Sequence, residues 1–240
     1  MSSSVSEVMP ARPDYWEEAC RHLARKDRVM KRLIPQCGDG CLQSRGDAFT
    51  TLARSIVGQQ ISVKAAQTVW DRFVEVARRS RASRPAGGEG DGAEAARRNA
   101  AEGAVAAARV LTLKVDDMRS AGLSARKIEY LVDLALHFDS GAIQSDAWPA
   151  MSDDEIIAEL VGIRGIGRWT AEMFLIFHLL RPNVLPLDDV GLINGISKNY
   201  FSGEAVSRSD TREVAAAWAP YCSVATWYIW RSLDPLPVAY

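Results

Sequence analysis

The segment Leu160–Ala171, Leu-Val-Gly-Ile-Arg-Gly-Ile-Gly-Arg-Trp-Thr-Ala, constrains the fold of this chain more than any other part of it. Helical periodicity precedes and follows the segment, and its glycines require the first helix to stop before the second begins. Upstream, Ser152-Asp-Asp-Glu155 matches a capping box, in which a serine and a glutamate bond each other's exposed backbone donors. The pattern predicts a helix-hairpin-helix over 153–180, whose second helix begins near Arg168.

This hairpin has features that attract a phosphate group. The first turn of its second helix leaves backbone N–H groups without partners at the positive end of the helix dipole. Arg164 and Arg168 flank the two glycines, and we expect them to form a local basic patch with Lys64 and Lys127. A net charge of −1 argues against broad attraction to nucleic acid, so the contact has to be local. The alternative is an ordinary glycine-capped turn between helices.

Ile163–Ala171 resembles the hairpin of the helix-hairpin-helix DNA glycosylase superfamily. The similarity includes Ser55-Ile-Val-Gly-Gln-Gln-Ile-Ser-Val-Lys-Ala-Ala66 and covers roughly residues 45–235, less one insertion. Trp169 and the Asp188-Asp189 pair look most like the branch for alkylated bases, 3-methyladenine DNA glycosylase II, in a short form without the N-terminal β-domain. The resemblance implies an all-α fold of two helical subdomains with the active site between them.

The resemblance also implies a catalytic carboxylate. Asp189, within Asp189-Val-Gly-Leu192, matches the catalytic aspartate of the superfamily. A carboxylate beside the sugar stabilises the positive charge that builds up as a base leaves, and it can orient or deprotonate a water molecule. Asp188 is the second candidate. Capping of the helix that begins here is the alternative for both residues, since an aspartate before a helix commonly binds its first N–H groups.

The aromatic residues Trp169, Trp230, Trp227 and Tyr228 are candidates for a base pocket. An alkylated purine is cationic and electron-poor, so an aromatic face binds it by stacking and by cation–π attraction. Filling of a helical core is the alternative. Trp169 also matches the position, two after Gly167, where bifunctional relatives carry the lysine that cuts the strand. The resemblance therefore implies a monofunctional enzyme that hydrolyses 3-methyladenine and 7-methylguanine from DNA without AP-lyase activity.

Further residues are predicted by resemblance to contact DNA. Gln60 would enter the gap left by the flipped base, with helix capping as the alternative. The full predicted DNA-binding set is Gln59, Gln60, Ile163, Arg164, Gly165, Ile166, Gly167, Arg168 and Thr170. The backbone carbonyls of Val161, Ile163 and Ile166 match positions where relatives hold a monovalent cation, Na⁺ or K⁺.

Composition limits the remaining classes. The 240 residues contain no apolar run near the length of a membrane span, and the N-terminus does not read as a secretory signal, so we expect a cytoplasmic protein. The four cysteines form no metal-binding pattern, and the C-terminal segment 230–240 has none, so no iron–sulfur cluster and no required cofactor is expected. The expected partner is double-stranded DNA with damaged bases, bound by a monomer.

The sequence predicts a flexible N-terminus over 1–13 and a helical core over 14–240. N-caps are expected at Asp14, Asp47, Ser62, Ser124, Ser152 and Ser209. Residues 79–103 lack bulky apolar side chains and are predicted to be a disordered insertion. The predicted helices are 14–33, 47–59, 62–78, 105–112, 115–120, 125–138, 153–161, 168–180, 189–200, 210–218 and 221–232.

Three functions remain open from the sequence. The first is a monofunctional glycosylase for alkylated bases, and the second is a non-catalytic helix-hairpin-helix DNA-binding protein. The third is a glycosylase for mispaired or oxidised bases. The aspartate pair favours an enzyme, because a protein that only binds DNA gains nothing from carboxylates near phosphates. Trp169 and the missing lysine favour the first function over the third.

Overall fold

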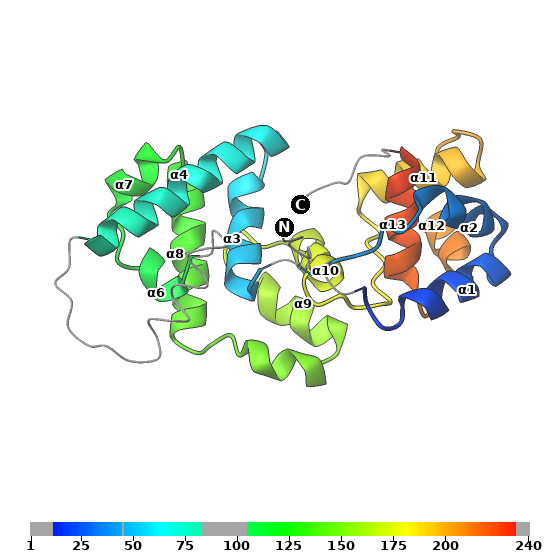
Figure 1. Ribbon diagram of the computed structural model, residues 1–240, viewed down its shortest axis with the longest axis horizontal. Helices are drawn as coiled ribbons and strands as arrows, with labels where there is room; N and C mark the ends of the chain where they lie inside the picture. Colours follow the sequence, from blue (N-terminus) through cyan, green and yellow to red (C-terminus); the bar gives the residue numbers. More distant parts are fainter. Residues whose placement is uncertain (1–11, 45, 83–104, 234–240) are drawn as a thin grey trace, which may run out of the picture. The chain divides into compact units, whose positions relative to one another are not determined.

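The computed structural model describes residues 12–44, 46–82 and 105–233. Within these residues every regular element is a helix, and no strand occurs among them, as the sequence predicts (Figure 1). The chain divides into two compact units, with the described residues up to Ser44 and from Leu175 onward in unit 1 and those between them in unit 2. None of the described helices is long and apolar enough to cross a membrane.

Unit 1 combines the N-terminal and C-terminal helices of the chain. It contains α1 (Trp16–Lys26), α2 (Arg28–Leu33), the 3-10 helix η1 (Ile34–Cys37), α11 (Val190–Tyr200), α12 (Arg208–Ala215) and α13 (Cys222–Leu233). Its core is built from fully buried side chains such as Leu23, Met30 and Ile229. These apolar groups leave water together, which is the main favourable contribution to folding of the unit.

The predicted helix over 14–33 is wrong, because Asp27 divides it into α1 and α2. The Asp27 backbone is extended, and its Oδ1 accepts hydrogen bonds from the N–H groups of Val29 and Met30 at 2.7 and 3.0 Å. Its Oδ2 binds two further donors, the Tyr200 hydroxyl and the Trp218 indole. A buried carboxylate with this many donors stabilises the break.

Two other predictions near helix starts in unit 1 need correction. Asp14 does not cap α1, whose N-cap is Tyr15 without a side-chain bond. Ser209 does not cap α12, because Ser207, two residues earlier, forms a capping box with Asp210. Arg12 pairs with Glu17, so the predicted flexible N-terminus does not extend to Arg12, and residues 1–11 lie outside the described residues.

Unit 2 contains the central part of the chain. Its elements are α3 (Ala48–Gly58), α4 (Val63–Ala82), α6 (Ala107–Val110), α7 (Val115–Ser120), α8 (Ala125–Asp139), the 3-10 helix η2 (Ser145–Ala150), α9 (Asp153–Val161) and α10 (Arg168–Phe177), whose residues from Leu175 onward belong to unit 1. The predicted bounds of α7 and α9 are confirmed, and the side chains of Asp47, Ser62, Ser124 and Ser152 accept the expected hydrogen bonds at helix starts. The 3-10 helix η2 is not predicted by the sequence.

The edges of two predicted segments shift in unit 2. Helix α4 continues to Ala82, so residues 79–82 are helical and do not belong to the predicted insertion. The rest of that insertion, 83–103, lies outside the described residues. The second helix of the hairpin, α10, ends at Phe177 and not at 180.

Candidate active site

The N-terminus of α11 holds a buried carboxylate, that of Asp189, which is 6% exposed. Asp189 is the N-cap of the helix, and its Oδ1 accepts a hydrogen bond from the backbone N–H of Leu192 at 2.6 Å. The same oxygen accepts a hydrogen bond from the indole Nε1 of Trp230 at 2.7 Å. Hydrogen bonds to a charged group are among the stronger ones in proteins, so these two donors fix the orientation of the carboxylate.

Trp230, on α13, is itself held by packing. The residue is 8% exposed, and its ring stacks on that of Phe177 with centroids 5.6 Å apart and planes 13° from parallel. Gly191 leaves room beside the hydrogen bond, because a Cβ there would lie 3.1 Å from both Asp189 Oδ1 and the Trp230 ring. The sequence places Trp230 in a base pocket, whereas its contacts favour a role in positioning Asp189.

The close packing of α11 on α13 brings these two side chains together. A Cβ on Gly195 would lie 2.2 Å from Cγ2 of Ile229, which is too short for two nonbonded carbon atoms unless one of the helices moves. Glycine at this position therefore allows the helix backbones to approach until Trp230 reaches Asp189. The sequence gives no sign of the role of Gly195 or Phe177, since neither residue lies in a recognisable motif.

The neighbouring Asp188 has a different environment. Its side chain is 53% exposed and forms an ion pair with Arg208. Of the two aspartates, Asp189 performs the capping that the sequence offers as an alternative for both. Capping is compatible with the predicted catalytic role, because the hydrogen bond at the start of α11 also holds the buried carboxylate in place.

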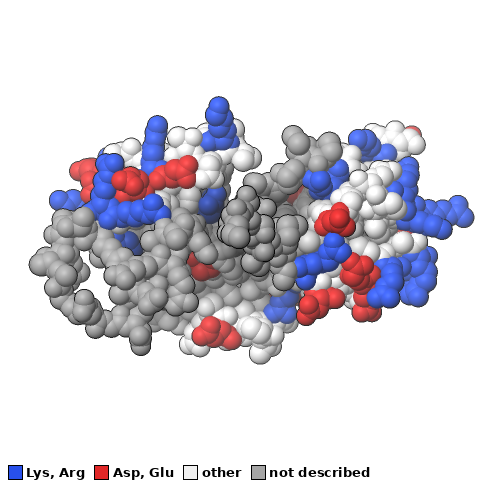
Figure 2. Space-filling model, in the orientation of Figure 1, with Lys and Arg blue, Asp and Glu red and all other residues white. Residues whose placement is uncertain are grey.

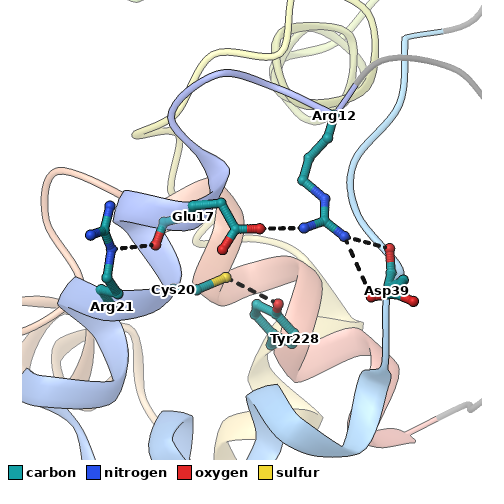
Figure 3. Close-up of polar contacts among 6 residues, drawn as sticks. All are labelled: Arg12, Glu17, Cys20, Arg21, Asp39 and Tyr228. Atoms are coloured by element: carbon teal, nitrogen blue, oxygen red, sulfur yellow. Dashed lines mark hydrogen bonds and ion pairs between the residues drawn. The ribbon is translucent and has the colours of Figure 1, made fainter.

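Trp227 and Tyr228 have the contacts of packing residues in unit 1. Tyr228 is 2% exposed, and its hydroxyl lies 3.2 Å from Sγ of Cys20 on α1 (Figure 3). Burial raises the pKa of Tyr228 above its ordinary value. The Trp227 ring packs edge-on against Trp16, with centroids 5.4 Å apart. These contacts favour a packing role for both residues over the predicted pocket role.

The hairpin between α9 and α10, in unit 2, is a tight turn on α8. Gly165 has φ +87°, and a Cβ there would lie 2.2 Å from the Tyr130 ring, so both its backbone conformation and the lack of space require glycine. Asp133 Oδ2 accepts a hydrogen bond from the N–H of Arg164 at 2.8 Å. By contrast, a Cβ on Gly167 would meet nothing within 4 Å. Packing within the protein therefore does not account for glycine at position 167.

The α3–α4 turn is attached to this hairpin. The Gln59 side-chain Nε2 donates a hydrogen bond to the carbonyl oxygen of Gly165 at 2.8 Å. Next to it, Gln60 is exposed and has φ +60°, which is uncommon for a residue with a side chain. The turn and the hairpin, which the sequence predicts as separate DNA-binding segments, therefore form one surface of unit 2.

The remaining predicted residues of the hairpin divide into buried and exposed groups. Ile163 and Ile166 are 1% and 4% exposed, so their side chains anchor the turn and only their backbone groups can face a ligand. Thr170 is also buried, at 8%. Trp169 is 40% exposed at the start of α10, which leaves part of its indole accessible for stacking.

The predicted basic patch is weaker than the sequence indicates. Arg164 forms an ion pair with Glu129, and Arg168 pairs with Asp154 and Glu172. The Lys127 ammonium donates to the carbonyl of Val57 at 2.7 Å, and burial lowers its pKa. Lys64 is exposed. Three of the four expected cations are thus already engaged within unit 2, which reduces the net positive field beside the hairpin.

Comparison with known proteins places the chain in a family. A family model described as the HhH-GPD superfamily of base excision DNA repair proteins matches residues 53–220. This chain belongs to that superfamily. The Bacillus subtilis protein YfjP, named as a candidate DNA-3-methyladenine glycosylase, is 30% identical over 186 residues, which are 78% of this chain and 59% of YfjP. The matched part of the chain thus spans less than two thirds of the length of that relative.

Two solved structures of superfamily members share the fold. A DNA-3-methyladenine glycosidase from Bacillus halodurans is 30% identical with a TM-score of 0.73, and the match covers 89% of this chain and 87% of that one. A 3-methyladenine DNA glycosylase from Schizosaccharomyces pombe, in complex with abasic DNA, is 27% identical with a TM-score of 0.71, covering 93% and 99%. These likenesses agree with the all-helical fold and with membership of a family that repairs DNA.

Proposed function

We propose that this protein is a monofunctional DNA glycosylase that hydrolyses the N-glycosidic bond of alkylated bases, with 3-methyladenine and 7-methylguanine as substrates. The observation that carries the proposal is the buried Asp189 carboxylate, fixed through Oδ1 by two N–H donors. A DNA-binding module without catalysis would need this group only to cap α11, and a cap requires neither burial nor a second donor from Trp230. The relatives named as 3-methyladenine glycosylases support the choice of substrate.

In the proposed reaction the bond between C1′ of the sugar and the base nitrogen breaks, and its electron pair leaves with the base. The sugar acquires oxocarbenium character, which the negative charge of Asp189 stabilises. A water oxygen then bonds to C1′, and its proton passes to the carboxylate or to solvent. A base alkylated at N3 or N7 is already cationic and a good leaving group, so the reaction needs little acid catalysis.

Trp169 is the residue that we assign to base recognition. Its partly exposed ring at the start of α10 offers a stacking face, and stacking of one base on an aromatic ring contributes roughly 1–3 kcal/mol. A cationic base gains an additional electrostatic attraction to the ring. Trp169 also occupies the position at which the resemblance places the lysine of bifunctional relatives. Because an indole cannot form a Schiff base, we expect no AP-lyase activity.

The hairpin surface is the proposed contact with duplex DNA. The open space at Gly167 permits a phosphate to approach the first N–H groups of α10. Gln60, exposed on the attached α3–α4 turn, is the proposed wedge that fills the stack after the damaged base flips. Equal loss of excision from duplex and single-stranded DNA in Gln60→Ala would contradict the wedge, since only a duplex has a stack to fill.

The carbonyls of Val161, Ile163 and Ile166 are the proposed groups that would hold a monovalent cation. The Ile163 carbonyl accepts a hydrogen bond from the N–H of Ile166 at 3.1 Å, but a carbonyl oxygen has a second lone pair for a cation. When bound, the cation would supply positive charge at the hairpin. We expect tighter duplex binding in KCl than in tetramethylammonium chloride at equal ionic strength, and equal affinities would contradict the site.

The experiment that tests the proposal is incubation of the protein with methylated genomic DNA and identification of the released bases. Release of 3-methyladenine and 7-methylguanine, with no strand cleavage and no adduct trapped by borohydride, is the expected result. Faster release of 8-oxoguanine or uracil, or a trapped adduct, would overturn it. We expect one copy to act alone, and light scattering of the protein bound to a short duplex measures this stoichiometry.

A further inference from the structure

Cations are concentrated on α1 and α2, in unit 1, outside the hairpin. Between Ala19 and Gly38 the one carboxylate is Asp27, which is buried and bonded to internal donors. Figure 2 shows Lys and Arg gathered over the part of unit 1 that carries these two helices. All six cationic residues of the stretch are exposed, and together we call them the basic surface: Arg21, Arg25, Lys26, Arg28, Lys31 and Arg32.

Helix dipoles explain only part of this distribution of charge. Arg21 and Arg25 are four residues apart on α1, and Arg28 and Arg32 are four apart on α2. Like charges at this spacing face each other and destabilise a helix. Arg28 is also the first residue of α2, where the helix dipole disfavours a cation. The dipoles favour the cations in the last turns of the two helices. They do not explain the two repulsive arginine pairs or the cation at the start of α2.

The basic surface also differs from the hairpin in how its cations are engaged. The hairpin arginines pair with carboxylates. On the basic surface, the recorded partners are neutral. Arg21 donates to the Glu17 carbonyl (Figure 3), and Arg32 donates to the Asn199 side chain.

The other four members of the basic surface have no recorded partner. Among the described residues, the side chains of Arg25, Lys26, Arg28 and Lys31 make no hydrogen bond or ion pair. Their charges therefore remain available to an external anion. Arg21 and Arg25 also line an open hollow on α1, together with His22 and the acidic Glu18.

We propose that the basic surface binds the phosphodiester backbone of duplex DNA and forms a second, sequence-independent contact outside the hairpin. Closely spaced Lys and Arg side chains release counterions from DNA and bind its phosphates without reading bases. Two repulsive arginine pairs and a cation at a helix start are relieved when such a polyanion is bound. This inference rests on the proposed function, since it takes DNA to be the substrate.

The test uses the full-length protein and two variants with equal loss of charge. The first variant carries Arg25→Ala, Lys26→Ala, Arg28→Ala and Lys31→Ala, which remove the cations without recorded partners. The control carries Arg72→Ala, Lys114→Ala, Arg119→Ala and Arg126→Ala, exposed cations of unit 2. Circular dichroism and melting temperatures check that both variants fold. Affinity for an undamaged duplex is then measured against NaCl concentration.

We expect the plot of log affinity against log salt to become shallower by about 2 to 4 in the first variant, since each lost phosphate contact removes roughly 0.9 from the slope. The control should change it by less than about 1. Equal changes in both variants, or no change in the first, would overturn the basic surface while leaving glycosylase activity intact. A first variant that keeps the wild-type slope but loses binding to polyglutamate would overturn it in favour of an acidic protein partner.

Failure of the proposed function has a different signature. If the wild-type protein neither binds duplex DNA nor releases alkylated bases, both proposals fail together. If it does both, single-turnover excision at saturating DNA should be the same in the first variant as in the wild type. Only the DNA concentration needed for half-maximal rate should rise, because the basic surface does not include the proposed catalytic carboxylate of Asp189.

Discussion

The carboxylate at the start of α11 and the hairpin between α9 and α10 differ in how their charged groups are placed. In the first, a charged group is buried and fixed by neutral donors from Leu192 and Trp230. In the second, the backbone turns at the surface, and the charged side chains beside it are paired with carboxylates. The difference indicates that an oriented charge is the main feature at the proposed catalytic site. At the proposed DNA contact, the main feature is the conformation of the backbone turn.

The largest expected effect is that of Asp189→Asn. Asparagine is as good an N-cap as aspartate, so the stability of α11 should hardly change. The negative charge beside the sugar is lost, and single-turnover excision of 3-methyladenine should fall by about a hundredfold or more. Affinity for duplex DNA should stay within a few-fold of the wild type. A variant that excises at a near-normal rate would remove Asp189 from the mechanism.

Trp230→Phe tests whether the indole N–H positions the carboxylate. Phenylalanine keeps an aromatic ring for Phe177 to stack on but removes the donor to Asp189. A hydrogen bond to a charged group contributes about 1.5–3 kcal/mol, so the rate of excision should fall roughly tenfold to a hundredfold with unchanged DNA affinity. Trp227→Phe, on the same helix, is the matched control and should excise normally. Equal losses in the two variants would indicate a general disturbance of α13.

The two glycines of the hairpin separate folding from binding. Gly165→Ala forces a side chain into the Tyr130 ring at positive φ and should lower the free energy of unfolding by about 2–4 kcal/mol. Gly167→Ala meets open space, so the free energy of unfolding should change by less than about 1 kcal/mol. Its affinity for duplex DNA should nevertheless fall several-fold. Chemical denaturation and fluorescence anisotropy measure the two effects, and an unchanged affinity in Gly167→Ala would argue against phosphate binding at this turn.

The smallest effect is expected from Asp188→Asn. Its ion pair with Arg208 is more than half exposed on both sides, and exposed pairs contribute at most about 1 kcal/mol. Both the melting temperature and the excision rate should stay close to wild-type values. If this variant loses excision while Asp189→Asn keeps it, the catalytic assignment is wrong by one residue.

Much of the fold could be predicted because local signals were strong. Capping residues such as Asp47 and Ser124 mark where their helices begin, and hydrophobic periodicity gives the helix type. The break at Asp27 escaped prediction because it depends on Tyr200 and Trp218, more than 170 residues away in sequence. At α12, two serines compete for the cap, and the aspartate three residues after Ser207 decides between them.

The identity of the candidate carboxylate stays a prediction from resemblance, whereas its arrangement is visible only in the structure. Resemblance indicates Asp189, but the hydrogen bond from Trp230 depends on how α11 packs on α13. The weakness of the basic patch could be predicted in part from the sequence, since Arg168 and Glu172 are four residues apart on one helix and can form an ion pair. The pairing of Arg164 with Glu129 was not, because it joins two separate helices.

Gly195 has a consequence for any attempt to map this protein by mutagenesis. It lies six residues along α11 from Asp189, about 9 Å by helical rise. Gly195 packs so closely against Ile229 that any side chain there would push α13 away from α11. This displacement would also move the indole N–H of Trp230 away from Asp189. A saturation scan scored by activity would therefore mark Gly195 as essential and draw it, wrongly, into the list of reacting groups. A series of substitutions of increasing size at Gly195 would instead lengthen, step by step, the distance between the Trp230 indole and the Asp189 carboxylate.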